Sequence, residues 1–158
     1  MLSQFSGAIL DHYRRYRFLL WRFWDDRPRM LFVGLNPSTA NELEDDPTVR
    51  RLCGFAQSWG YGGLYACNVF SQITPYPSEL HQDTAVHPAD THAIQMVNEL
   101  VALRVCGWGD GIAKADYGYS RANTIKNYLK EPMCFGLTAK GNPKHPLYLP
   151  KEAELEEY

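Results

Sequence analysis

The chain has 158 residues, of which 45% are hydrophobic and 13% aromatic. This length fits one domain of about 100–150 residues, and the apolar content excludes an intrinsically disordered chain. The formal net charge of −2 excludes a globally basic protein of the kind that attracts nucleic acid through its whole surface. We therefore expect a single domain over residues 1–158.

The first predicted element is an N-terminal hairpin over about residues 14–29. Residues 17–24 are aromatic and apolar, and residues 25–28 (DDRP) then supply turn chemistry. Six arginines lie in the first 29 residues, whereas residues 150–158 form an acidic tail. This segregation fits a local basic patch, and it fits equally a solvated arm and a solvated tail.

A buried strand is predicted at residues 30–34, a short continuous apolar run that ends in the loop GLNPS. A helix follows from Asp46 to about Trp59. Asp46 can cap the first amides, Pro47 suits the first helical position, and glycines follow the last turn.

The rest of the chain continues to alternate strands with helices. The sequence predicts strands at residues 64–70, 103–108 and 133–137, helices at about 89–100 and 119–129, and a long loop at 71–88. Such alternation favours a parallel sheet with helices on both faces. The expected fold is a three-layer α/β/α domain with a central, mainly parallel four-stranded sheet, its core at about residues 30–149.

No apolar run approaches the about 20 residues that span a bilayer, and the N-terminus lacks a signal-peptide pattern. We therefore expect a cytoplasmic protein without membrane contact. The four cysteines form no C-x-x-C pair, and the histidines show no metal-ligand spacing. These spacings favour buried reduced thiols and predict neither a metal nor a cofactor.

Polar residues collect where the predicted strands end. In open α/β sheets, ligands bind outside the carboxyl ends of the strands. These ends carry residues 34–39, Asn68, residues 107–110 and residues 136–148. We expect the functional site at this edge of the sheet.

The motifs GLNPSTA, DDPTVRR, FAQSWGYGGL, CNVF, CGWG and GNPKHPLYL together resemble the domain-of-unknown-function 1643 family over about residues 14–149. A second resemblance is to the uracil-DNA glycosylase superfamily. Members of that superfamily carry a G-x-[DN]-P motif after the first core strand, an Asn at the end of the second and a His-Pro motif after the last. Residues 34–37 (GLNP), Asn68 and His145-Pro146 match these motifs in order.

The glycosylase resemblance implies a uracil-DNA glycosylase-like fold and hydrolysis of the N-glycosidic bond of a modified or deaminated base in DNA. Asn36 would then orient the water, neutral His145 would donate to the departing base, and Asn68 would pair with the base edge. The other substrate contacts expected at the strand ends are Gly34, Leu35, Pro37, Ser38, Thr39, Phe70 and Trp108. For phosphate we expect Arg50 and Lys144.

Each assignment has a structural alternative. Asn36 before Pro37 is ordinary turn chemistry, Asn68 can anchor a neighbouring loop, and His145 can be an exposed loop residue. Asp45 and Asp46 are expected to cap the helix rather than to act as acids.

The sequence also departs from the glycosylase pattern. The His-Pro motif lacks the serine that usually follows it, the first motif lacks an acidic residue, and only Leu147 and Tyr148 are available to wedge into duplex DNA. Two other functions therefore stay open. One is a non-catalytic module that binds nucleotides or nucleic acid, and the other is a hydrolase of free nucleosides or nucleotides.

Overall fold

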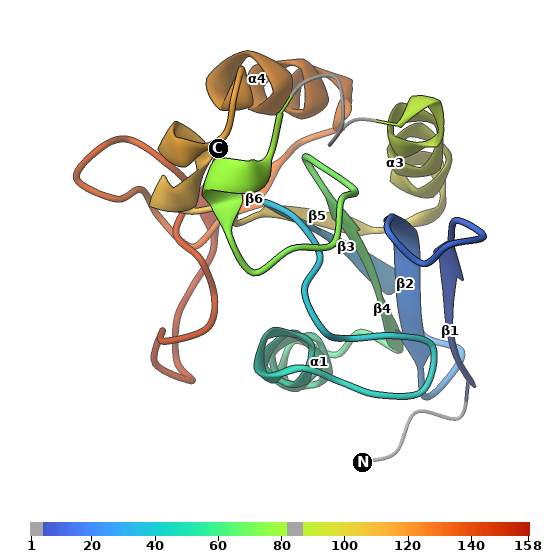
Figure 1. The fold of residues 1–158 in the computed structure, drawn as a ribbon. Helices are drawn as coiled ribbons and strands as arrows, with labels where there is room; N and C mark the ends of the chain where they lie inside the picture. The colour runs from blue at the N-terminus through green and yellow to red at the C-terminus, as the bar shows by residue number, and fades with distance from the viewer. Residues whose placement is uncertain (1–4, 82–86) are drawn as a thin grey trace.

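Seven strands form one mixed sheet in the order β1-β2-β4-β3-β5-β6-β7 in the computed structural model, which describes residues 5–81 and 87–158 (Figure 1). The strands are β1 (Phe5–Leu10), β2 (Arg17–Phe23), β3 (Arg29–Gly34), β4 (Gly63–Asn68), β5 (Leu103–Cys106), β6 (Met133–Cys134) and β7 (Glu156–Glu157). The helices within the described ranges are α1 (Pro47–Ser58), α3 (Pro88–Leu100) and α4 (Gly118–Tyr128), with short 3-10 helices η1 (Pro77–Glu79) and η2 (Asp110–Lys114).

The predicted α/β class is correct, but the predicted four-stranded sheet is wrong. The four expected strands correspond to β3, β4, β5 and β6, which pair in parallel. Three further strands add antiparallel pairs at the two sides of this group: β2 pairs with β4, β1 with β2, and β7 with β6. The acidic tail therefore contributes an edge strand. Its glutamate side chains are exposed, and its backbone pairs with β6.

The N-terminal hairpin exists, but its predicted bounds of 14–29 are wrong. β1 and β2 form it, and the Asp11 carboxylate closes the turn by accepting from the amides of Arg15 and Tyr16 at 2.6 and 2.7 Å. Residues 25–28 connect β2 to β3, which are not neighbours because β4 lies between them. Turn residues mark a change of chain direction without specifying which strands then pair.

Helices cover both faces of the sheet, as Figure 1 shows with α1 on one side and α3 and α4 on the other. Side chains alternate along β3. Met30 and Phe32 pack in the cluster that contains Leu52 and Phe55 of α1. Leu31 and Val33 pack in the cluster that contains Ile94 and Val97 of α3 and Ala122 and Ile125 of α4. The carboxyl ends of β3, β4 and β5 are thereby held rigidly between the two helical layers.

The helix start at Asp46 is confirmed. Its carboxylate accepts from the Val49 amide at 2.8 Å, and Pro47 occupies the first turn. All four cysteines are free, and burial raises the pKa of the Cys53 and Cys67 thiols to about 12. Of the long loop predicted at residues 71–88, residues 82–86 lie outside the described residues. Residues 71–81 contain the short η1 and an isolated bridge between Gln72 and Tyr16. Among the helices that are described, none is both long and apolar enough to cross a membrane.

Candidate functional site

Asn36, Asn68 and His145 line one pocket of about 360 Å³. Asn36 lies in the loop after β3, Asn68 is the last residue of β4, and His145 belongs to the loop that follows β6. Gly34, Leu35, Pro37, Ser38 and Trp108 also line it. The pocket lies at the carboxyl ends of the parallel strands, where ligands of open α/β sheets bind, and its volume falls in the range of small-molecule sites.

The Asn36 carboxamide is fixed by the loop that follows β4. Its nitrogen donates to the carbonyl oxygens of Thr74 at 2.7 Å, Pro37 at 3.1 Å and Gln72 at 3.3 Å. Because all three partners are acceptors, the nitrogen must face them, and Oδ1 is the atom left for a ligand. Asn36 thus combines the expected turn role with a preorganised acceptor in the pocket.

The Asn68 side chain makes no hydrogen bond to any residue in the described ranges. Backbone groups join the adjacent loops instead: the Val69 amide donates to the Gly34 carbonyl at 2.8 Å and the Phe70 amide to the Leu35 carbonyl at 2.9 Å. The loop-anchoring alternative therefore has no contact to support it. An amide without an intramolecular partner offers both a donor and an acceptor to a ligand.

Gly34 leaves the space that the Asn68 amide occupies, and we expect Gly34→Ala to turn this amide away. A Cβ at residue 34 would lie 2.9 Å from Oδ1 of Asn68 and 3.1 Å from the Phe32 ring. The expected result is a shifted Asn68 side-chain amide signal in NMR spectra and weaker ligand binding, with the fold retained. The matched control is Gly54→Ala in α1, where nothing lies within 4 Å of the new Cβ. This control should raise stability by about 0.5–1 kcal/mol and leave Asn68 unchanged.

His145 is exposed at the rim of the pocket, with its tautomer set by a backbone amide. The Leu147 amide donates to Nδ1 at 3.2 Å, so the proton of the neutral ring resides on Nε2. Partial desolvation of the ring lowers the pKa of His145 below its ordinary value of 6.5, while the Asp46 carboxylate opposes this shift. The ring is therefore a neutral Nε2–H donor at pH 7.

Two glycines let the His145 loop approach the end of β5. Gly109 has a φ of +67°, and a Cβ there would lie 3.4 Å from Cβ of His145. A Cβ at Gly107 would lie 2.6 Å from the Phe32 ring and 3.1 Å from the Lys144 carbonyl oxygen. The motif CGWG thus has two reasons: a side chain at Gly107 would press on the Phe32 ring and the histidine loop, and the positive φ at Gly109 favours glycine.

Asp110 also lines the pocket and anchors this loop. Its Oδ1 accepts from the Thr138 hydroxyl at 2.6 Å and from the Asn142 amide at 2.8 Å, and these two bonds lower the pKa of the carboxyl. Asp110 is therefore ionised at neutral pH. Sequence reasoning placed Asp110 at a strand end without assigning it a role, although its position directly after CGWG was a usable signal.

Four of the predicted contact residues do not line the pocket. Phe70 is fully buried in the core between the sheet and α3, so it cannot stack on a ligand there. The Thr39 amide is occupied by the Ser38 hydroxyl at 2.6 Å. Arg50 is on α1, where its guanidinium donates to the Asp45 carbonyl at 2.7 Å, and Lys144 is exposed beside the site. Trp108 remains as the predicted aromatic wall.

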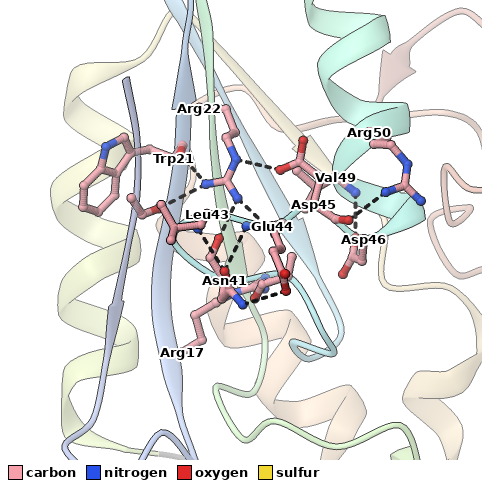
Figure 2. A network of polar contacts seen from close by, with 12 residues as sticks. Arg17, Trp21, Arg22, Asn41, Leu43, Glu44, Asp45, Asp46, Val49 and Arg50 are labelled. Carbon is pink, nitrogen blue, oxygen red and sulfur yellow. Dashed lines mark hydrogen bonds and ion pairs between the residues drawn. The ribbon is translucent and has the colours of Figure 1, made fainter. Parts of the chain in front are cut away.

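Two arginines of the N-terminal cluster are buried, which corrects the alternative of a solvated arm. Arg22 is 2% exposed, and Figure 2 shows it bound to the loop that precedes α1. It donates to the Asp45 carboxylate at 2.7 Å and to the carbonyls of Asn41 at 2.6 Å and Glu44 at 3.2 Å. Arg17 is 5% exposed and lines the pocket itself. Sequence reasoning missed this residue as a member of the site.

Comparison with protein-family models gave a match over residues 17–147 to a family described as "Protein of unknown function (DUF1643)". Comparison with curated proteins and with solved structures gave no match. The resemblance to uracil-DNA glycosylases therefore has no independent support from relatives.

Proposed function

Since the chain belongs to the DUF1643 family of proteins of unknown function, we propose its activity from the pocket: hydrolysis of the N-glycosidic bond of a modified or deaminated nucleobase. The observation that carries the proposal is the presence of Asn36, Asn68 and His145 in one pocket. We further propose that the domain is related to the uracil-DNA glycosylase superfamily. The order of these three residues along the chain, at the ends of parallel strands and in the final loop, supports that relationship.

The proposed reaction passes through a cation-like sugar and a base that departs with negative charge. Oδ1 of Asn36 accepts a hydrogen bond from the attacking water, and Nε2–H of His145 donates to the base as its charge develops. The water oxygen bonds to the sugar as the glycosidic bond breaks, and the proton that the water loses neutralises the departed base anion. The Asn68 amide pairs with the base edge. The ionised Asp110 carboxylate contributes negative charge near the sugar. This charge compensates for the lack of an acidic residue in the first motif.

The test is a panel of single- and double-stranded oligonucleotides, nucleosides and nucleotides that carry uracil, hypoxanthine or other altered bases. The free base is measured by chromatography, and abasic sites in the oligonucleotides by strand cleavage in alkali. We expect base release from at least one substrate. Tight binding without any release would instead favour a non-catalytic binding module.

The rate of base release should depend on pH through His145. Because the pKa of His145 is lowered, the rate should be level at neutral pH and fall as the pH drops through a pKa that lies below the ordinary histidine value. Protonation at Nδ1 would place its N–H against the N–H of the Leu147 amide, which already donates to that atom. Two donors would then oppose each other, which is unfavourable. Single-turnover rates between pH 4.5 and 8 measure this profile. The residual activity of His145→Ala should no longer fall at acidic pH. If the rate of this variant falls at acidic pH as that of the wild type does, another group causes the pH dependence.

A further inference from the structure

Arg17 is a buried cation whose hydrogen-bonding capacity is mostly unused. Its Nη1 donates to the Ala40 carbonyl oxygen at 2.8 Å, and this is its only side-chain hydrogen bond to the described part of the chain. Nε is buried and has no hydrogen-bond partner among the residues that the structure describes. A guanidinium carries five N–H donors, and a buried donor left without an acceptor is costly.

Arg22, on the same strand, shows how this protein satisfies a buried arginine without a ligand. Its three nitrogens all donate, to the Asp45 carboxylate and to backbone carbonyls (Figure 2). Arg17 has no such set of partners. Burial lowers the pKa of Arg17 to about 10, and the nearby Asp46 carboxylate opposes this shift only in part. Asp46 itself is engaged by the Val49 amide at 2.8 Å and by the Ser38 hydroxyl at 3.4 Å.

The unused donors of Arg17 lie on the edge that recognises oxyanions. Nε–H and one Nη–H of a guanidinium point in parallel, and this fork binds carboxylate or phosphate through two hydrogen bonds. In Arg17 the engaged nitrogen is Nη1, so the Nε–Nη2 edge is the one without a partner. Asn36, Asn68 and His145 line the same pocket as neutral groups, and Asp46 and Asp110 line it as acidic ones. Arg17 is thus the lining residue suited to a negatively charged part of the ligand.

We propose that Arg17 forms a phosphate subsite of the pocket and that the substrate is a free nucleoside 5′-monophosphate. This inference rests on the proposed function, in which the neutral residues hold the base. Arg17 is 5% exposed, so only a group that enters the pocket reaches it. A terminal phosphate can enter, whereas the phosphates inside a polynucleotide are flanked by sugars on both sides. The net charge of −2 also fits a small ligand better than a nucleic-acid strand.

Calorimetric titration tests the subsite with four probes: inorganic phosphate, nucleoside 5′-monophosphates, the matching nucleosides, and oligonucleotides without a terminal phosphate. We expect the wild-type protein to bind phosphate and to bind a monophosphate at least tenfold more tightly than its nucleoside. Arg17→Lys keeps the charge but loses the fork, so it should abolish most of this preference and leave nucleoside affinity unchanged. The matched control, Arg27→Lys, changes an exposed arginine paired with Asp25 and should keep the preference.

A second measurement needs no variant. In the ¹⁵N-labelled wild-type protein, the Nε–H signal of Arg17, assigned through bonds to its own side chain, should shift on addition of phosphate, and that of Arg22 should not. The subsite is refuted if monophosphate and nucleoside bind equally, if Arg17→Lys folds and keeps the preference, or if oligonucleotides without a terminal phosphate bind as tightly as the monophosphate.

The outcomes for the two proposals are distinguishable. Monophosphate binding that depends on Arg17, without release of base, would support the subsite and contradict the hydrolase. Base release that is as fast from nucleosides as from monophosphates, and is unaffected by Arg17→Lys, would support the hydrolase and contradict the subsite.

Discussion

Replacement of His145 by alanine is expected to lower the rate constant of base release by about 10²–10³-fold, the range for loss of one donor to a developing negative charge. Within residues 5–81 and 87–158, the side chain makes a single hydrogen bond, from the Leu147 amide, and it lies at the rim. Its removal should therefore leave the fold intact. Single-turnover rates on the best substrate of the panel measure the effect, and thermal unfolding checks the fold.

The matched control for this variant is His92→Ala, which removes an exposed histidine of α3 that does not line the pocket. It should retain the wild-type rate. A His145→Ala protein that keeps its rate within about threefold would mean that His145 is only a loop residue, as its structural alternative holds.

The second large effect is on stability. Arg22→Met should lower the free energy of unfolding by about 3 kcal/mol, because it leaves the Asn41 carbonyl without its donor and removes the partner of the Asp45 carboxylate. The Glu44 carbonyl keeps the Asn41 amide as a donor at 3.0 Å. Urea unfolding measures the change. These contacts hold the loop that leads into α1, so the variant should unfold in one transition that includes this helix.

Arg27→Met is the control for this stability effect. Arg27 pairs with Asp25 at 2.7 Å, but the two side chains are 51% and 37% exposed, and pairs that solvent reaches contribute about 0–1 kcal/mol. If Arg22→Met were no more destabilising than Arg27→Met, the loop before α1 would have to be held by other contacts.

The parallel part of the sheet and its helices could be predicted because their signals are local. Residues 30–34 form a continuous apolar run, and Asp46 and Pro47 mark a helix start within two residues. The antiparallel additions could not be predicted in this way. β1 shows no buried apolar run, β7 is a pair of exposed glutamates, and the pairing of β2 with β4 joins residues about forty apart in the chain.

The polar residues of the site could be predicted from the ends of parallel strands, which converge whatever the details of packing. Asn36 and Asn68 line the same pocket for that reason. The glycines of CGWG let the His145 loop pack close to the end of β5, so His145 lines the pocket as well. Arg17 was missed because arginine is usually exposed, so a cluster of arginines suggests a surface arm. Phe70 was misplaced because it lies two residues past the end of β4, where the chain turns into the core.

A crystal structure of the protein grown with the base that it releases, or with uracil and hypoxanthine in turn, tests the central claim most directly. The account predicts that the base lies in the pocket, with its edge on the Asn68 amide and one of its acceptors within hydrogen-bond distance of Nε2 of His145. A base bound elsewhere, or a pocket that stays free of base at saturating concentration, would contradict the assignment of this pocket to nucleobase recognition.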